Sequence, residues 1–363
     1  MPDFQTFLLF LAAALVPGNS RGVIFVLLCL MGLMSATTAF AQAGARLDAR
    51  SDSDDALTDA MLATPNAQTP APLSNLFATS PGLEKQIATP QIRANVLLPF
   101  AWNSNADELS HGGTSSGEAT PSANLSWATP VGTLPLRATL SAFAELDRYF
   151  HTPEMDLDKA GLSARLQYVD PHNDQAFSPY FTFAPRWDFA PTFGSQLSAR
   201  QDSNLGFNKR FNFDANFQQV PFAPDTSAST VWSIGLTAFI QRRLREPQVS
   251  SDAVFFIPSA SYVISNSWNA SFAVEFLGRW FDQRNLVFFD QGNLGLATRD
   301  YEVHPIITLE YVIPAQFLGG EKNARLLGQP ALDLQASYLR VWSNGLAGGF
   351  EQWKGVAALK MGW

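Results

Sequence analysis

The sequence WKGVAALKMGW, residues 353–363 at the C-terminal end, carries the clearest fold signal in the chain. With the period of two that a β-strand imposes, its residues separate into two faces: Trp353, Gly355, Ala357, Leu359, Met361 and Trp363 on one, and Lys354, Val356, Ala358, Lys360 and Gly362 on the other. A strand rises about 3.3 Å per residue, so the two tryptophans lie roughly 33 Å apart along it. At a tilt of about 40° this is roughly 25 Å along the normal, the height of the apolar band of a transmembrane barrel. We predict a membrane-spanning strand whose lysines face a lumen, with an amphipathic edge strand of a soluble β-sandwich as the alternative.

The same alternation recurs along the chain from Ile92 onward. Apolar residues occupy every second position, and serine, asparagine, threonine and charged residues lie between them. The alternating segments span residues 92–102, 123–127, 136–146, 159–168, 177–189, 204–213, 232–240, 254–264, 271–280, 301–313, 332–338 and 353–363. These are about twelve strands, an even number as in bacterial single-chain barrels. With the C-terminus on the periplasmic side, the connections near 190–203 and 241–252 are predicted to be long and external.

Five prolines argue against this assignment. Pro99, Pro179, Pro185, Pro258 and Pro305 fall within the predicted strands. A closed barrel has no free edge at which a residue without an N–H is tolerated. Strand ends beyond the bilayer or bulges accommodate some of them, but Pro185 and Pro305 keep open the alternative of a secreted, soluble β-sandwich.

The first 41 residues have the composition of a secretory signal. Arg21 precedes an apolar run from Val23 to Met34, and the small-x-small sequence Ala39-Phe40-Ala41 provides a cleavage site. The run is shorter than the about 20 residues that span a bilayer. The chain's single cysteine, Cys29, lies within this removable segment, so we expect no disulfide in the mature protein. We predict a signal peptide at residues 1–41.

Composition divides the remaining chain and excludes several classes of function. Residues 42–90 are rich in Ala, Thr, Pro and Asp and poor in large apolar residues, so we predict a disordered periplasmic lead before a barrel domain at residues 91–363. Charged residues make up only 15% of the chain, against about 25% in soluble proteins. The 29 Phe and 9 Trp fit strands and interfacial belts. A net charge of −8 argues against nucleic acid as a partner.

The signal ending Ala39-Phe40-Ala41, the strand series from Ile92 and the alternation ending in Trp363 together resemble the bacterial outer-membrane β-barrels of the porin-like class. The resemblance covers about three-quarters of the chain and indicates no subfamily. It implies an all-β fold, a transmembrane antiparallel up-and-down barrel in the cell outer membrane. It also implies contact with lipid and lipopolysaccharide, and a terminal aromatic strand that the barrel-assembly machinery reads. The implied assembly signal and aromatic girdle are Trp353, Leu359, Met361, Trp363, Tyr301 and Tyr311.

The polar faces of the predicted strands collect charges of both signs. A charge on the lipid face costs about 2 to 4 kcal/mol at mid-bilayer, so we expect these side chains to point inward. The predicted lining residues are Arg137, Glu145, Arg165, Arg186, Arg210, Glu275, Arg279, Glu302, His304, Glu310, Lys354 and Lys360. They form either a pore lining that selects solutes or a set of ion pairs that fills a narrow lumen.

Catalytic and metal-binding patterns are weak. Neither His111 nor His151 has the strand spacing to serine or aspartate that outer-membrane hydrolases use. His304 is expected to face the lumen between Glu302 and Glu310 as a structural residue, with a buried proton partner as the alternative, and no paired histidines suggest a metal site. Residues 242–245 hold three arginines, predicted to lie in an outer loop where they suit lipopolysaccharide phosphates, with an ordinary solvated loop as the alternative. We predict no enzyme, cofactor or metal.

The predicted function is passive or facilitated passage of small solutes through an outer-membrane barrel. The alternatives are an outer-membrane enzyme, a structural or adhesive barrel with a blocked lumen, and the secreted β-sandwich.

Overall fold

A computed structural model of the chain describes residues 90–106, 113–170, 176–219, 231–246, 250–265, 267–284, 297–344 and 349–363. The predicted signal peptide and almost all of the predicted lead lie outside the described residues, as do His111 and His172.

The described residues form one antiparallel sheet of 13 strands. The strands are β1 (Gln91–Asn103), β2 (Ser116–Ala119), β3 (Ser122–Pro130), β4 (Leu136–Tyr149), β5 (Leu157–Tyr168), β6 (Ser178–Phe189), β7 (Gln196–Phe213), β8 (Trp232–Glu246), β9 (Ser251–Val263), β10 (Trp268–Arg284), β11 (Ala297–Val312), β12 (Ala331–Ser343) and β13 (Glu351–Gly362). Each long strand pairs with its neighbours in sequence, which is an up-and-down order.

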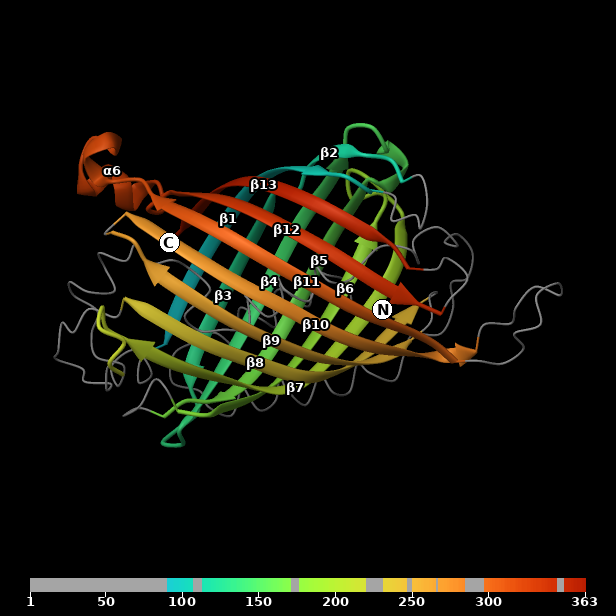
Figure 1. Cartoon of the computed structure of the whole chain (residues 1–363), viewed down its shortest axis with the longest axis horizontal. Helices are drawn as coiled ribbons and strands as arrows, with labels where there is room; N and C mark the ends of the chain where they lie inside the picture. Colours follow the sequence, from blue (N-terminus) through green and yellow to red (C-terminus); the bar gives the residue numbers. More distant parts are fainter. Residues whose placement is uncertain are drawn as a thin grey trace, which may run out of the picture.

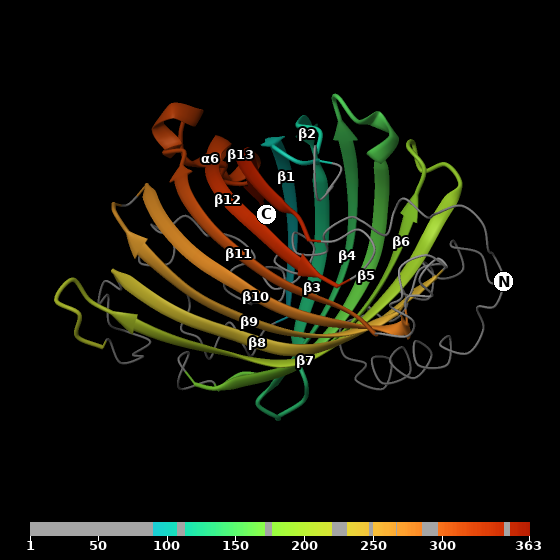
Figure 2. The same ribbon diagram turned by 45° about the vertical axis from the view of Figure 1, so that its right-hand side comes forward.

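The sheet closes on itself because β13 pairs with β1, from Gly362 opposite Asn95 to Lys354 opposite Asn103. Strands β2 and β3 lie end to end: β2 pairs with the last residues of β1, β3 pairs with the first, and both pair with β4. Together they fill one position around the barrel, so the 13 strands make a closed barrel of 12 positions (Figures 1 and 2). The predicted number of strands is confirmed, and a single closed sheet excludes the two-sheet sandwich.

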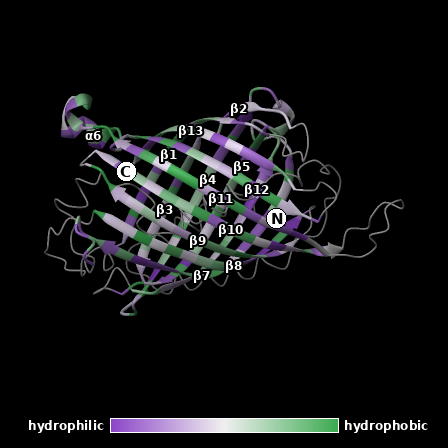
Figure 3. Ribbon diagram, in the orientation of Figure 1, coloured by the Kyte–Doolittle hydropathy of each residue, from purple (hydrophilic) through white to green (hydrophobic). Residues whose placement is uncertain are grey.

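The barrel is apolar outside and polar inside, the reverse of a soluble protein. On the outer face Ile307 is 59% exposed and Phe100 62%, whereas on the inner face Glu275 and Arg243 are fully buried. The alternation appears as bands of apolar and polar residues along the strands (Figure 3). A wall with this pattern places its apolar side chains in lipid and its charges in the interior.

The prolines lie where the ladder of strand pairs is interrupted on one side. Pro185 falls in a gap in the pairing of β6 with β5, Pro258 in a gap between β9 and β10, and Pro305 in a gap between β11 and β12. Pro99 faces the break between β2 and β3, and Pro179 lies past the last pair that β6 makes with β5. A missing N–H at an existing gap removes no ladder hydrogen bond, which removes this objection to the barrel.

The prediction of long external connections is wrong at two places. The connections between β6 and β7 and between β8 and β9 span only residues 190–195 and 247–250, because β7 and β8 continue past their predicted ends. The connection between β11 and β12, at the same end of the barrel as the C-terminus, carries a 3-10 helix η4 (Ala315–Leu318) and a helix α6 (Glu321–Leu326). No helix among the described residues is long and apolar enough to cross a membrane.

Candidate functional site: the inner wall of the barrel

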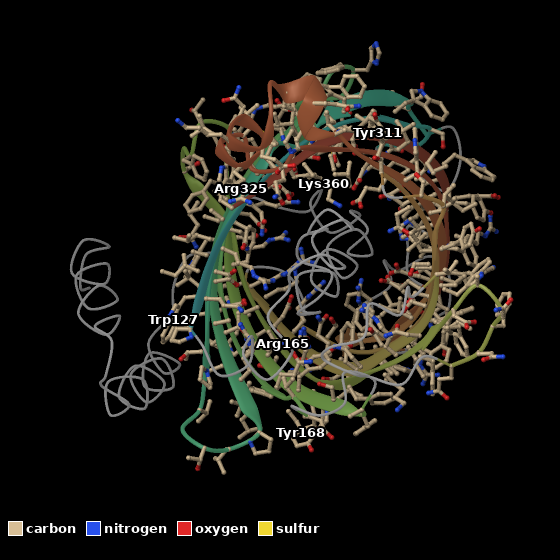
Figure 4. All side chains as sticks on the ribbon, turned by 90° about the vertical axis from the view of Figure 1, so that its left-hand side faces the viewer. Trp127, Arg165, Tyr168, Tyr311, Arg325 and Lys360 are labelled. Carbon is tan, nitrogen blue, oxygen red and sulfur yellow. The ribbon has the colours of Figure 1, made fainter. Side chains whose placement is uncertain are left out.

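All the predicted lining residues lie on the inner face of the barrel. Their positions alternate with outward-facing apolar residues, and most of them are buried; Arg137, Arg165, Arg186, Glu275, Arg279, Glu302, His304 and Glu310 are each at most 9% exposed. Figure 4 shows Arg165 and Lys360 within the ring of strands and Trp127 and Tyr168 outside it. Their role in lining a pore stays a prediction.

The inner wall is divided electrostatically. Strands β4 to β8 direct eight basic and four acidic side chains inward: Arg137, Lys159, Arg165, Arg186, Arg200, Arg210, Arg243 and Arg245 against Glu145, Asp147, Asp188 and Asp202. Strands β10 to β12 direct one basic and five acidic side chains inward: Arg279 against Glu275, Asp300, Glu302, Glu310 and Asp333. These two sets of strands lie on opposite sides of the closed barrel, so a cationic half faces an anionic half.

Close ion pairs organise the cationic half. Asp202 is 1% exposed and is shared by two guanidiniums, with Arg243 Nε 2.8 Å from Oδ1 and Arg200 Nε 3.0 Å from Oδ2. Arg186 Nε lies 2.7 Å from Asp188 Oδ1. Such charge-assisted bonds offset the desolvation of groups buried in the wall.

Lysines bridge carboxylates at both ends of the interior. Lys159 Nζ lies 2.8 Å from Glu145 Oε1 and 2.9 Å from Asp147 Oδ2. Beside the anionic half, Lys360 of β13 has its Nζ 3.0 Å from Glu310 Oε2 and 2.9 Å from Asp333 Oδ2.

Three further pairs complete the charged inner wall. Lys354 pairs with Glu118 of β2. Arg279 lies 3.7 Å from Glu302, and His304 is opposite Glu275 across the β10–β11 pair. Most of the predicted lining residues are therefore brought together as charged neighbours, whereas no ion pair is seen for Arg165 among the described residues.

The sequence interpretation misses Arg200, Asp202 and Arg243 as inner-wall residues. The first two precede the predicted start of their strand at residue 204, and Arg243 follows the predicted end of its strand at residue 240. The period of two does continue through both segments, as Ser198, Arg200, Asp202, Asn204 and as Gln241, Arg243, Arg245. That continuation is the signal that identifies them.

The prediction that the three arginines of residues 242–245 lie together in an outer loop is wrong. All three arginines lie within strand β8, and the alternation sends Arg243 inward to Asp202. Arg242 faces outward and donates to both carboxylate oxygens of Asp282, at 2.7 and 2.5 Å.

Aromatic side chains ring the outer face near both ends of the strands. At the end of the barrel where the C-terminus lies, Trp268 packs on Tyr311 with 4.6 Å between ring centroids, and Trp363 is 49% exposed. Near the opposite end, Trp353 packs on Tyr338 at 4.6 Å, and Tyr301 is 48% exposed. Aromatic side chains at both ends of an apolar band are the pattern that the two interfaces of a membrane favour.

This is an outer-membrane β-barrel. The closed sheet, the apolar outer wall and the two aromatic belts leave no soluble arrangement for it. Tyr301, Tyr311, Trp353 and Trp363 lie on the outer face, and their roles as an aromatic girdle and as an assembly signal stay predictions.

No protein-family model and no curated protein matches the chain. Among solved structures it is similar to an outer membrane channel from Pseudomonas putida F1, with 10% identity and a TM-score of 0.43 over 75% of this chain and 95% of that chain. The translocator domain of the autotransporter NalP from Neisseria meningitidis has 9% identity and a TM-score of 0.35, over 85% and 97%. The NanC porin has 9% identity and a TM-score of 0.35, over 73% and 98%. These likenesses are too distant to indicate a family, and the assignment rests on the barrel itself.

Among the described residues, no group of three His, Cys, Asp or Glu side chains is placed to hold a metal ion.

Proposed function

We propose that the barrel is a channel for passive or facilitated passage of small polar solutes across the outer membrane. The observation that carries the proposal is the charged inner wall, with a cationic half on strands β4 to β8 facing an anionic half on strands β10 to β12. Solutes that lose water on entering a barrel need such groups to replace it.

The charge count supports a hydrated interior over a set of ion pairs that fills it. On β4 to β8 the basic side chains outnumber the acidic ones two to one, so pairing within these strands leaves a net positive charge. An excess of buried charge is strongly unfavourable unless water or a counter-ion reaches it. Over the two halves together the charges balance, nine basic against nine acidic side chains, but the two signs lie on opposite sides of the barrel and not side by side.

Conductance in planar bilayers tests the proposal. We expect single-channel events from folded protein, identified by its compact migration on gels before boiling. Arg137→Glu should shift the reversal potential in a salt gradient toward cations, because it reverses a charge on the cationic wall. Arg340→Glu is the matched control: Arg340 lies on the outer face over Trp342, and its reversal should leave selectivity unchanged.

The other outcomes correspond to the alternative functions. A barrel that inserts into the bilayer and shows no events would indicate a structural or adhesive role with a blocked lumen. Two partners accompany the channel proposal: lipopolysaccharide against the outer face, and the barrel-assembly machinery at the strand ending in Trp363.

A further inference from the structure

One part of the inner wall departs from the polar pattern. Tyr180 of β6, Phe239 of β8, Phe255 and Ile257 of β9 and Leu277 of β10 form a buried apolar cluster on the inner face, here called the lumen row. The rings of Phe239 and Phe255 stack at 4.3 Å with 12° between their planes.

A glycine allows the lumen row to run unbroken. Gly206 of β7 lies between Tyr180 and Phe239 in the strand pairing. A Cβ at this position would lie 2.3 Å from the Cβ of Phe239 and 2.4 Å from the Ala238 carbonyl oxygen. Only a residue without a side chain lets the two rings share this part of the wall.

The lumen row ends at a guanidinium. Arg165 of β5 lies over the Tyr180 ring, with its Cζ 3.8 Å from the ring centroid. With the Asn208 amide oriented to satisfy its neighbours, its oxygen accepts from Arg165 Nη2 at 3.1 Å. Among the residues that the structure describes, Nε and Nη1 of Arg165 have no hydrogen-bond partner, although Arg165 is only 7% exposed.

Arg165 also differs from its basic neighbours. Arg186, Arg200 and Arg243 each bind an aspartate. Within the described part of the chain no ion pair involves Arg165, and its register neighbours on β4 and β6 are Thr139 and Thr182. The Thr182 hydroxyl likewise has no hydrogen-bond partner in the described ranges. A buried guanidinium with two unused donors and no ion pair is an anion site that the described residues do not fill.

We propose that Arg165 and the lumen row form a binding site for small organic carboxylates with an aromatic or aliphatic body. The carboxylate accepts from Arg165 Nε and Nη1, and the apolar body lies along Tyr180 and Phe239. Charge-assisted bonds fix the anionic end, and burial of apolar surface retains the other. The inference deepens the proposed channel function, on which its role as a solute site rests, while the binding itself does not depend on conduction.

Equilibrium binding of benzoate to the folded full chain in detergent tests this site, measured by equilibrium dialysis. We expect saturable binding. Acetate, which lacks the apolar body, and benzyl alcohol, which lacks the charge, should each bind at least about tenfold more weakly.

Variants distinguish specific binding of benzoate at this site from general effects of a substitution on the barrel. Arg165→Gln should weaken benzoate binding by about tenfold or more, and Arg165→Lys should fall between it and the unaltered protein, because lysine keeps the charge and loses the planar fork. Phe255→Leu should weaken benzoate binding by about threefold through loss of the Phe239 stack and leave acetate unchanged. Arg340→Gln removes a charge from the outer face and should change neither.

The outcomes distinguish the site from the channel. A protein that conducts but does not bind benzoate saturably, or binds it equally well after Arg165→Gln, overturns the site and leaves the channel. Benzoate binding that depends on Arg165 in a protein without conductance supports the site and overturns the channel. If Arg165→Gln fails to fold, Arg165→Lys decides: affinity for benzoate equal to that of the unaltered protein overturns the site.

Discussion

At the scale of single residues, the inner face of the barrel wall holds several buried ion pairs. Asp202 accepts two hydrogen bonds from Arg243 and forms an ion pair with Arg200, and both its own side chain and that of Arg243 are 1% exposed. Breaking a buried pair from one side leaves an uncompensated charge and is far more costly than the pair's net contribution. Removal of one partner from these pairs should therefore lower the free energy of unfolding, whether or not the lumen conducts.

We predict that Asp202→Asn lowers the free energy of unfolding by about 3 to 5 kcal/mol, because it removes the carboxylate that Arg200 and Arg243 share. Urea titration followed by the fraction of compact, heat-modifiable protein measures this. Asp282→Asn is the matched control. Asp282 pairs with Arg242 on the outer face, and 42% of its side chain is exposed. This substitution should therefore lower the free energy of unfolding by less than about 1 kcal/mol. Equal losses for the two variants would contradict a buried ion network.

At the scale of elements, each strand tolerates a proline only where its ladder is already open. Pro305 lies opposite Val274 on β10 but in a gap against β12, whereas Ile307 pairs on both sides, with Phe272 and Ala336. The two positions face the same way and differ in their backbone partners.

We predict that Pro305→Val changes the free energy of unfolding by less than about 1 kcal/mol, whereas Ile307→Pro lowers it by about 3 kcal/mol or more through a lost ladder bond and a steric clash. The same urea titration compares them. Similar effects at both positions would argue against the register of β11.

The terminal strand closes the barrel through its backbone. Trp363 N donates to the Ala94 carbonyl at 2.8 Å, and Ala94 N donates to the Trp363 carbonyl at 2.9 Å. The indole N–H donates to the Leu326 carbonyl at 2.9 Å. The last residue thus contributes two backbone bonds and an interfacial ring.

Deletion of Trp363 should sharply lower the amount of compact barrel in the outer membrane, and Trp363→Phe should retain most of it, because phenylalanine keeps the backbone bonds and an aromatic ring. Gel mobility before and after boiling measures the assembled fraction. Normal assembly after the deletion would remove the role of this residue as an assembly signal.

The number of strands and the side of the wall on which each side chain lies were predictable from the sequence, whereas the ends of the strands were not. A period of two over several residues identifies a wall that separates lipid from a polar interior. The pattern weakens where strands leave the bilayer: residues 196–203 of β7 have only Leu197 as a large apolar residue on the outward side. Without lipid there is no requirement for apolar residues, so β7 and β8 continue beyond the region in which their sequence alternates clearly.

At the scale of the whole molecule, the interior depends on register between strands that are distant in sequence. Alternation predicted that Arg165, Glu275 and Lys360 face inward. It could not predict that Arg165 lies over Tyr180, nor that basic and acidic side chains collect on opposite halves. Those arrangements follow from how each strand is offset against the next, which the period of two does not specify.

Uptake of a small sugar by proteoliposomes tests most directly whether this interior is a channel. Liposomes containing folded protein, diluted into an isosmotic arabinose solution, should swell at a rate that rises with the amount of protein, because the sugar enters through the hydrated lumen and water follows. Liposomes made with the boiled protein serve as the control. Swelling no faster than that control, from protein shown to be folded and inserted, would contradict a channel for small solutes.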